Sequence, residues 1–293
     1  MTITDSTLSG NTAGFGGGTY NTGTLTIVNS TVSGNTASEG AGTYNATTLT
    51  ITNSTFSGNA ATAGGASFNN GTLEIANSTL SDNSADIGGG VVNLGTFQIG
   101  NTILNRGASG ENIYNNGGGT VTSLGYNISS DDGGGFLTGP GDQINTDPLI
   151  GPLQNNGGPT FTHELLSGSP AINAGDPSFT PPPFFDQRGP GFDRVVNGRI
   201  DIGSFEVQTQ TVAIHVEASG RKVGGINTVR LTWTGATSSN IDVYRDGIVI
   251  ATVPNTGTYT DSTGDTGRAR YTYKVCEAGT STCSNEVTVR FRH

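Results

Sequence analysis

The stretch that decides the fold is the segment LTIVNSTVSGN, which begins at Leu25 and returns as LTITNSTFSGN at Leu49 and LEIANSTLSDN at Leu73. The period is 24 residues, with a partial copy from Thr2 and a degenerate fifth copy from Phe97. A fixed period of this length is typical of repeat architectures. One apolar position recurs in every copy and consists of Ile3, Ile27, Ile51, Ile75 and Ile99.

Apolar and polar residues alternate within each copy, as in Leu49-Thr50-Ile51-Thr52, and this is the period of a strand rather than of a helix. Short strands broken by Asn and Gly cannot bury an apolar face alone, but stacked identical coils can. We therefore predict an all-β chain in which residues 1–127 form a right-handed parallel β-helix of about 24 residues per coil. Because the pattern begins in the middle of a repeat, we expect further coils upstream.

A second recurring position is polar. Asparagine tolerates the left-handed backbone conformation, and its amide bonds to neighbouring coils, so this column predicts an amide ladder along the solenoid. Its members are Asn11, Asn35, Asn59 and Asn83.

The repeats resemble those of chlamydial-type polymorphic outer-membrane proteins, which carry FxxN followed by GGA and Ile or Leu. The resemblance is best in the third coil, at Phe56-Ser57-Gly58-Asn59 and Gly64-Gly65-Ala66. It implies a surface or adhesin setting.

From about Val121 the period dissolves into motifs such as NTDPL, SPAINAGD, DQRG and DIGSFE. In this order the motifs resemble the C-terminal segment of exported bacterial proteins of the choice-of-anchor Q type. We expect residues 128–208 to be the C-terminal β-helix segment together with an irregular cap, since the last coil of a β-helix leaves apolar groups and strand edges uncovered. Five charged residues belong to these motifs, and Asp186, Arg188 and Asp201 are expected to tie the cap down by charge-assisted hydrogen bonds. The five are Asp147, Asp176, Asp186, Arg188 and Asp201.

Composition changes near residue 209. Residues 1–207 hold 16 acidic and 4 basic residues, a net charge of −12, whereas the remainder holds 7 and 9, a net charge of +2. The tail contains alternating strand patterns, and Asp246-Gly247 between two of them predicts a hairpin. Residues 209–293 therefore predict a small β-sandwich. Motifs such as Leu231-Thr232-Trp233 resemble fibronectin type III-like modules at the C-termini of secreted bacterial hydrolases.

The two cysteines, Cys276 and Cys283, fall on strands of the expected last hairpin. A cross-strand disulfide is the better interpretation if the chain is exported, because thiols then meet oxidising surroundings. A metal pair is disfavoured without neighbouring His or further Cys.

Composition also argues against several classes of protein. A chain of 293 residues with 47 glycines, 23 acidic and 13 basic residues is an unlikely binder of nucleic acid. No apolar run is long enough for a transmembrane segment, and no signal peptide is visible.

β-Helices host polysaccharide hydrolases and lyases, whose chemistry uses paired carboxyl groups. Asn145-Thr146-Asp147 resembles a polygalacturonase motif and Asp131-Asp132 its paired acids, but the order is wrong and the other motifs of that family are absent. His163 is interpreted as a hydrogen-bonded structural residue, and no nucleophile or metal-binding motif occurs. We predict no catalytic residues, no metal site and no cofactor.

The sequence thus favours a non-catalytic, adhesin-like or structural stalk protein, secreted or on the surface of a bacterium. Its expected partners are like chains, stacked end to end into filaments, or surface glycans. The alternative is a polysaccharide-binding or polysaccharide-degrading β-helix protein with an accessory fibronectin type III-like domain.

Overall fold

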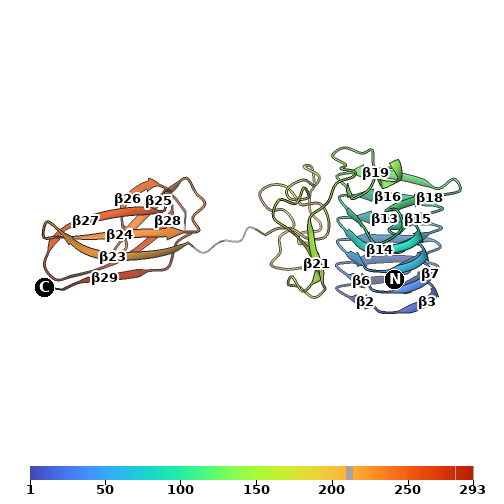
Figure 1. Ribbon diagram of the computed structural model, residues 1–293, viewed down its shortest axis with the longest axis horizontal. Coiled ribbons are helices and arrows are strands. Elements are labelled where there is room, and N and C mark those ends of the chain that lie inside the picture. The colour runs from blue at the N-terminus through green and yellow to red at the C-terminus, as the bar shows by residue number, and fades with distance from the viewer. Residues whose placement is uncertain (209–213, 281, 293) are drawn as a thin grey trace. The chain divides into compact units, whose positions relative to one another are not determined.

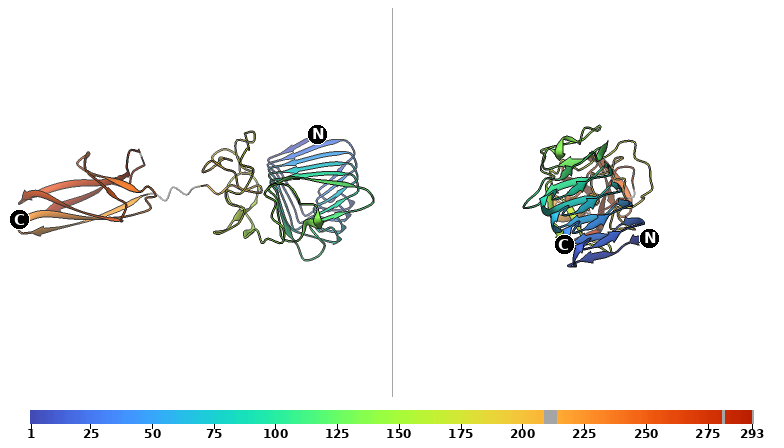
Figure 2. Two further views of the ribbon diagram at one scale, coloured as in Figure 1. Left: turned by 90° about the horizontal axis from the view of Figure 1, so that it is seen from above. Right: turned by 90° about the vertical axis from the view of Figure 1, so that its right-hand side faces the viewer.

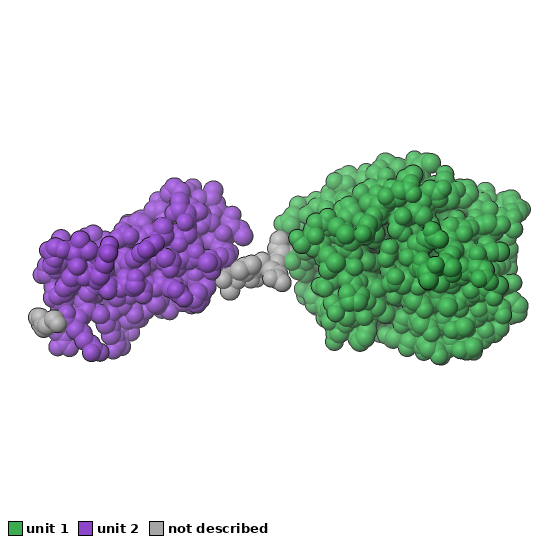
Figure 3. Space-filling model, viewed as in Figure 1, with its two compact units in different colours: residues 1–208 green, residues 209–293 purple. Residues whose placement is uncertain are grey.

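The computed structural model describes residues 1–208, 214–280 and 282–292. The chain divides into two compact units, Met1–Gln208 and Thr209–His293 (Figure 3). Each unit has its own hydrophobic core.

The first unit begins with a solenoid whose successive coils stack as parallel strands, in the order of the chain, from the blue first coil to the green last coil (Figures 1 and 2). Three sheets form its sides. The first sheet contains β1 (Thr2–Thr4), β5 (Thr24–Val28), β9 (Thr48–Thr52), β13 (Thr72–Ala76), β16 (Thr96–Gly100) and β19 (Thr120–Gly125).

The second sheet contains β2 (Thr7–Ser9), β6 (Thr31–Ser33), β10 (Thr55–Ser57), β14 (Thr79–Ile87), β17 (Ile103–Arg106) and β20 (Ile128–Ser129). Through the long strand β14 it continues into β11 (Ala60–Ala63), β7 (Thr36–Glu39) and β3 (Thr12–Phe15). The third sheet contains β4 (Thr19–Asn21), β8 (Thr43–Asn45), β12 (Ser67–Asn69), β15 (Val91–Asn93) and β18 (Ile113–Asn115).

The register between coils equals the sequence period. In the first sheet Ile3 pairs with Ile27, and the same column continues through Ile51, Ile75 and Ile99. The last four of these side chains are at most 1% exposed and lie in one continuous core. The predicted all-β fold with parallel coils of about 24 residues is therefore confirmed, with about five coils.

Glycine and asparagine form the corners of the coils. Gly40 has a φ of +63°, and a Cβ atom there would lie 2.2 Å from the carbonyl oxygen of Thr43, so only glycine fits. The corner between the first and second sheets uses asparagine with a positive φ in four successive coils, at Asn29, Asn53, Asn77 and Asn101. The glycine excess in the sequence therefore reflects the tight corners of the coil.

Residues after β20 cover the solenoid in two ways. A short turn of 3-10 helix, η1 (Gly133–Gly135), brings Leu137 and Phe136 against the core of the last coils. The chain then runs through β21 (Ile150–Gln154) and β22 (Thr162–Leu165), beside the stacked coils rather than over their end (Figures 1 and 2). We name residues 144–208 the lateral cover.

This placement corrects the expectation that the irregular part of residues 128–208 caps the end of the last coil. The outer face of the second sheet carries one row of Thr side chains, continued by Ile103 and Ile128, and the lateral cover packs on that row. Hydroxyl groups in such a row offer hydrogen bonds at every coil, whereas the end of the solenoid offers one layer only.

The second unit consists of two antiparallel sheets. One contains β23 (His215–Val223), β24 (Ile226–Thr234) and β27 (Thr258–Thr266), and the other contains β26 (Ile248–Pro254), β25 (Asn240–Arg245), β28 (Ala269–Glu277) and β29 (Val287–Phe291). Trp233, Tyr273 and Phe291 lie in the core between them. The predicted Asp246-Gly247 hairpin joins β25 to β26, and both residues have a positive φ, as a type I′ turn requires. Among the described residues, no helix has the length and apolar character needed to cross a membrane.

Candidate functional sites

The predicted asparagine column lies inside the solenoid as a continuous ladder. The Nδ2 atom of Asn11 donates to Oδ1 of Asn35 at 3.0 Å, Asn35 to Asn59 at 2.9 Å and Asn59 to Asn83 at 2.8 Å. Each Oδ1 atom also accepts the backbone N–H of the preceding asparagine in the column. Such buried amides stabilise the coil because each loses its water and regains its hydrogen bonds from its neighbours.

Two further ladders were not predicted. One runs along the third sheet, where Asn45 donates to Asn69 at 2.7 Å and also to the carbonyl of Thr72. The other is a pair of contacts at the positive-φ corner, Asn53 to Asn29 and Asn101 to Asn77. The signal was present in the sequence, because these residues also recur every 24 positions, except that Asn115 follows Asn93 by 22. The longer unpredicted ladder contains Asn21, Asn45, Asn69, Asn93 and Asn115.

Gln187 fastens the lateral cover to the second sheet. It is fully buried, and its Nε2 atom donates to Oγ1 of Thr31 at 3.0 Å, while its Oε1 atom accepts from Thr55 at 2.6 Å. Ser204 continues the row by bonding the hydroxyl groups of Thr55 and Thr79. The motif DQRG thus contributes its glutamine to the contact between cover and coils.

The structure brings Asp186 and Arg188 together. Two nitrogens of Arg188 donate to the Asp186 carboxylate, at 2.5 Å from Nη2 and 3.0 Å from Nε to the same Oδ2 atom. The guanidinium group lies between the rings of Phe192 and Phe205, at 3.9 and 3.7 Å from their centroids. Asp186 also accepts the backbone N–H of Glu206. This pair joins the DQRG motif to the C-terminal end of the lateral cover at Glu206.

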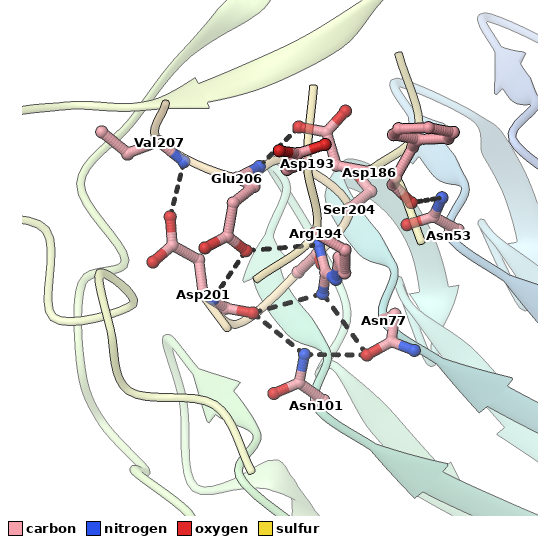
Figure 4. A network of polar contacts seen from close by, with 12 residues as sticks. Asn53, Asn77, Asn101, Asp186, Asp193, Arg194, Asp201, Ser204, Glu206 and Val207 are labelled. Carbon is pink, nitrogen blue, oxygen red and sulfur yellow. Dashed lines mark hydrogen bonds and ion pairs between the residues drawn. The ribbon is translucent and has the colours of Figure 1, made fainter. Parts of the chain in front are cut away.

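Asp201 lies in a second buried cluster with Arg194 and Glu206 (Figure 4). Arg194 donates from Nη2 to the carbonyls of Gly203 at 2.7 Å and Asp201 at 3.2 Å, and to Oδ1 of Asn77 in the solenoid at 3.3 Å. Its Nη1 atom is 3.9 Å from Oε2 of Glu206, which accepts the N–H of Asp201. The side chains of Arg194 and Glu206 are fully buried.

Burial dominates the protonation of this cluster. It raises the pKa of Glu206 to about 8, against the opposing effect of Arg194, and it also raises the pKa of Asp201. Burial lowers the pKa of Arg194, while three neighbouring carboxyl groups oppose that change. Glu206 is thus mainly protonated at neutral pH.

Raised carboxyl pKa values are also typical of catalytic acids, so access to the cluster matters. Asp186, Arg194 and Glu206 have no exposed surface and Asp201 is 1% exposed. A substrate cannot reach these groups while the lateral cover is in place. The cluster joins the cover to the coils, and Arg194 and Glu206 were not among the predicted residues.

The two remaining acids of the cap motifs lie outside both clusters. Asp147 accepts the N–H of Leu149 at 2.9 Å, and Asp176 accepts the N–H and hydroxyl of Ser178 at 2.8 and 2.7 Å. Each closes a local turn two residues long, a frequent role of aspartate.

His163 is buried between the lateral cover and the second sheet. Its Nδ1 atom is 2.7 Å from the carbonyl oxygen of Gly151, and its Nε2 atom is 3.0 Å from Oγ of Ser57. Burial lowers its pKa, so the ring is neutral at pH 7, with Nδ1–H as donor to the carbonyl and Nε2 as acceptor. Within residues 1–208, 214–280 and 282–292 there is no group of three His, Cys, Asp or Glu side chains placed to hold a metal ion.

An aromatic column lies on the outer surface of the third sheet. Tyr20, Tyr44 and Phe68 stack with ring centroids 5.1 and 5.3 Å apart, and Phe15 meets Tyr44 edge-on at 5.4 Å. Tyr20 and Phe15 are more than half exposed. Phe68 is 8% exposed, so the exposed part of the column is formed by the rings of the first coils. This column is the most continuous aromatic feature on the outside of the coils.

A groove of about 290 Å³ lies where the lateral cover meets the first coils. Pro182, Pro183 and Phe184 form its mainly apolar wall, and Asp5 and Asn29 lie on the side of the solenoid. The ring of Phe184 is 67% exposed.

In the second unit, the predicted disulfide between Cys276 and Cys283 is confirmed. Nearby in the same fold, Asp261 accepts from Nη1 of Arg245 and from the hydroxyl of buried Tyr273, both at 2.8 Å. These contacts cross from β27 to the other sheet and fix the two sheets to each other.

Comparisons with known proteins give no relatives. No protein-family model, no curated protein and no solved structure matches this chain.

Proposed function

We propose that this chain is a non-catalytic extracellular rod, an adhesin-like or structural stalk segment of a bacterial surface protein. The observation that carries the proposal is that the buried polar groups bond to one another and are closed off from any substrate. The interior amides bond coil to coil, and the two acids with raised pKa values, Asp201 and Glu206, are buried within the lateral cover. Such an arrangement stabilises an elongated scaffold, whose exposed surface is then free to bind a partner.

Further features support the finer parts of this proposal. The disulfide is consistent with an oxidising, extracellular setting. The strand orders β23-β24-β27 and β26-β25-β28-β29 support a fibronectin type III-like sandwich at the C-terminal end. The 24-residue coils support the polymorphic outer-membrane protein-like repeat. The motifs of the lateral cover support the choice-of-anchor Q-like segment.

End-to-end stacking of like chains into filaments is the proposed self-association. Leu137 and Phe136 pack against the core of the solenoid after its last coil, so a like chain that stacked at that end would have to displace them. Filament growth in one direction requires two complementary ends.

Polysaccharide binding is the second candidate, and the groove beside Phe184 favours it. Exposed proline and aromatic faces next to a carboxylate and an amide suit the apolar face and hydroxyl groups of a sugar.

The experiment that separates the two combines binding and turnover. The full chain is incubated with neutral and acidic polysaccharides, and both retention and the release of reducing or unsaturated ends are measured. We expect retention without products. Products that disappear in the Glu206→Gln variant, with unchanged folding, would overturn the non-catalytic proposal. The Phe184→Ala variant tests the groove, with Phe161→Ala, another exposed ring of the lateral cover, as its control.

A further inference from the structure

The C-terminal unit carries a cluster of arginines on one sheet face. Arg270 of β28 and Arg290 of β29 are direct cross-strand partners in the antiparallel register. Arg268 and Arg292 each stand one residue beyond the adjacent pair, Ala269 and Phe291. All four arginines are exposed. We name these four residues the arginine face.

Strand geometry places the four side chains together. Arg270 and Arg290 lie within β28 and β29 and are paired, so their side chains share one face of the sheet, whereas Arg268 and Arg292 stand one residue outside these strands and flank the pair. Ala269 and Phe291, which lie between the arginines in sequence, pack in the core on the opposite side of the sheet. Positions two apart along a strand are about 7 Å apart, and paired positions are about 5 Å apart. The arginine face thus has a cross-strand pair of positive charges at its centre, with one further arginine next to the end of each strand.

Among the described residues, no carboxylate forms an ion pair with any of these four arginines. The salt bridges there involve Arg188, Arg194, His215 and Arg245, and none of the four arginines. Asp265, the acid closest in sequence, accepts the hydroxyl of Tyr271 at 2.6 Å. Like charges placed directly opposite on a sheet destabilise it. The folded state therefore carries a repulsion that a bound anion would relieve.

The surroundings of the arginine face indicate the kind of anion. The next outward pair on the same strands is Thr272 and Thr288, whose hydroxyl groups are 3.3 Å apart. Beyond them Lys274 lies over the ring of Tyr244, 5.1 Å from its centroid. Hydroxyl groups beside guanidinium groups suit a ligand that has both anionic groups and hydroxyls. A membrane surface would be favoured instead by apolar side chains within the face.

We propose that the arginine face binds an acidic polysaccharide, through carboxylate or sulfate groups on neighbouring sugars. Arginine forms bidentate hydrogen bonds with such groups. The net charge of the whole chain, −10, disfavours a polyanion as dense as duplex DNA, which has one charge per about 1.7 Å. This inference goes beyond the proposed stalk function and does not depend on it.

The test uses the full chain and two double variants of equal charge change. Arg270→Glu with Arg290→Glu removes the centre of the arginine face. Arg221→Glu with Arg230→Glu changes two exposed arginines on the other sheet and is the matched control. Binding to polygalacturonate, dextran sulfate and neutral dextran is measured by titration at several salt concentrations. Polygalacturonate and dextran sulfate distinguish carboxylate from sulfate recognition.

We expect the first double variant to bind the acidic polymers at least about tenfold more weakly, and the control variant to change affinity less than about threefold. Binding should also weaken as salt rises, and neutral dextran should not bind. Equal losses in both variants, or no binding by the unmodified chain, would overturn the proposal. Tighter binding to duplex DNA or to anionic lipid vesicles would overturn the assignment to a polysaccharide.

A single variant separates binding from folding. Arg290→Glu places opposite charges at the Arg270 pair, so it should raise the unfolding midpoint of the C-terminal unit while it weakens binding. A variant that lost binding only because it unfolded would lower that midpoint. A failure of this test leaves the stalk proposal standing, because that proposal rests on the solenoid.

Discussion

Replacing Asn59 by alanine removes the centre of the interior amide ladder. The Nδ2 atom of Asn59 donates to Oδ1 of Asn83 at 2.8 Å and to the carbonyl of Val32 at 3.0 Å. Its Oδ1 atom accepts from the backbone N–H and from Nδ2 of Asn35, at 3.1 and 2.9 Å. The side chain is fully buried, so water cannot replace these four hydrogen bonds.

The cost follows from the four hydrogen bonds that are lost. Each contributes about 1 kcal/mol net, although Oδ1 of Asn83 keeps the backbone N–H of residue 59 and Nδ2 of Asn35 keeps the carbonyl of Leu8. We expect the solenoid to lose about 4 kcal/mol of unfolding free energy. Asn11→Ala is the matched control, because Asn11 is exposed and ends the ladder. Its cost should be about 1 kcal/mol.

Denaturant unfolding followed by far-ultraviolet circular dichroism measures this loss. The single tryptophan, Trp233, belongs to the C-terminal unit, so its fluorescence reports the other unit and should not change. A loss below about 1 kcal/mol, or the same loss in both variants, would refute the argument that the ladder holds the coils together.

Three further predictions concern the cover, the disulfide and the core. In the folded state the pKa of Glu206 is about 8, against 4.5 in the unfolded chain, so the free energy of unfolding falls as pH rises from 4.5 to 8. His163 has a lowered pKa in the folded state, so below pH 6.5 it makes the free energy of unfolding rise with pH and opposes the effect of Glu206. Thermal or denaturant titration should therefore show stability falling by about 2 kcal/mol between pH 6.5 and 8, and Glu206→Gln should flatten that fall; an unchanged slope would contradict the assignment. Replacing both Cys276 and Cys283 by alanine should destabilise the C-terminal unit by about 2.5 kcal/mol, measured by Trp233 fluorescence, with the solenoid unaffected. Phe56→Ala should cost the solenoid about 4 kcal/mol because the ring is 1% exposed, whereas Phe184→Ala, 67% exposed, should cost under about 0.5 kcal/mol; similar losses would argue against the assigned core.

The fold was predictable because its determinant is local and repeated. The spacing of Ile27, Ile51 and Ile75 in the sequence is the register of the first sheet, so stacking coils needs no information beyond the period. The same holds for the Asp246-Gly247 hairpin, whose turn type depends on two adjacent residues. Asn45 and Asn69 follow the same rule, and their ladder was missed although the period contains it.

The lateral cover was harder to predict because its contacts join residues far apart in the chain. Arg194 meets Asn77 across 117 positions, and Gln187 meets Thr31 across 156. No sequence period relates these residues. The row of Thr hydroxyl groups on the second sheet also does not specify which later segment of the chain will cover it. Asp186 and Arg188 were expected to tie the cap down, but their pairing with each other was not predicted, and the burial of Glu206 depends on how the whole cover folds back.

The central claim is that 24-residue coils hold their buried polar side chains in ladders. Hydrogen exchange of asparagine side-chain amides, followed by nuclear magnetic resonance, tests it most directly. The account predicts slow exchange of the Nδ2 protons of Asn35, Asn59 and Asn69, with through-space contacts to the residue 24 positions away. Exchange of these protons at the rate of free, solvated amides, without such contacts, would contradict it.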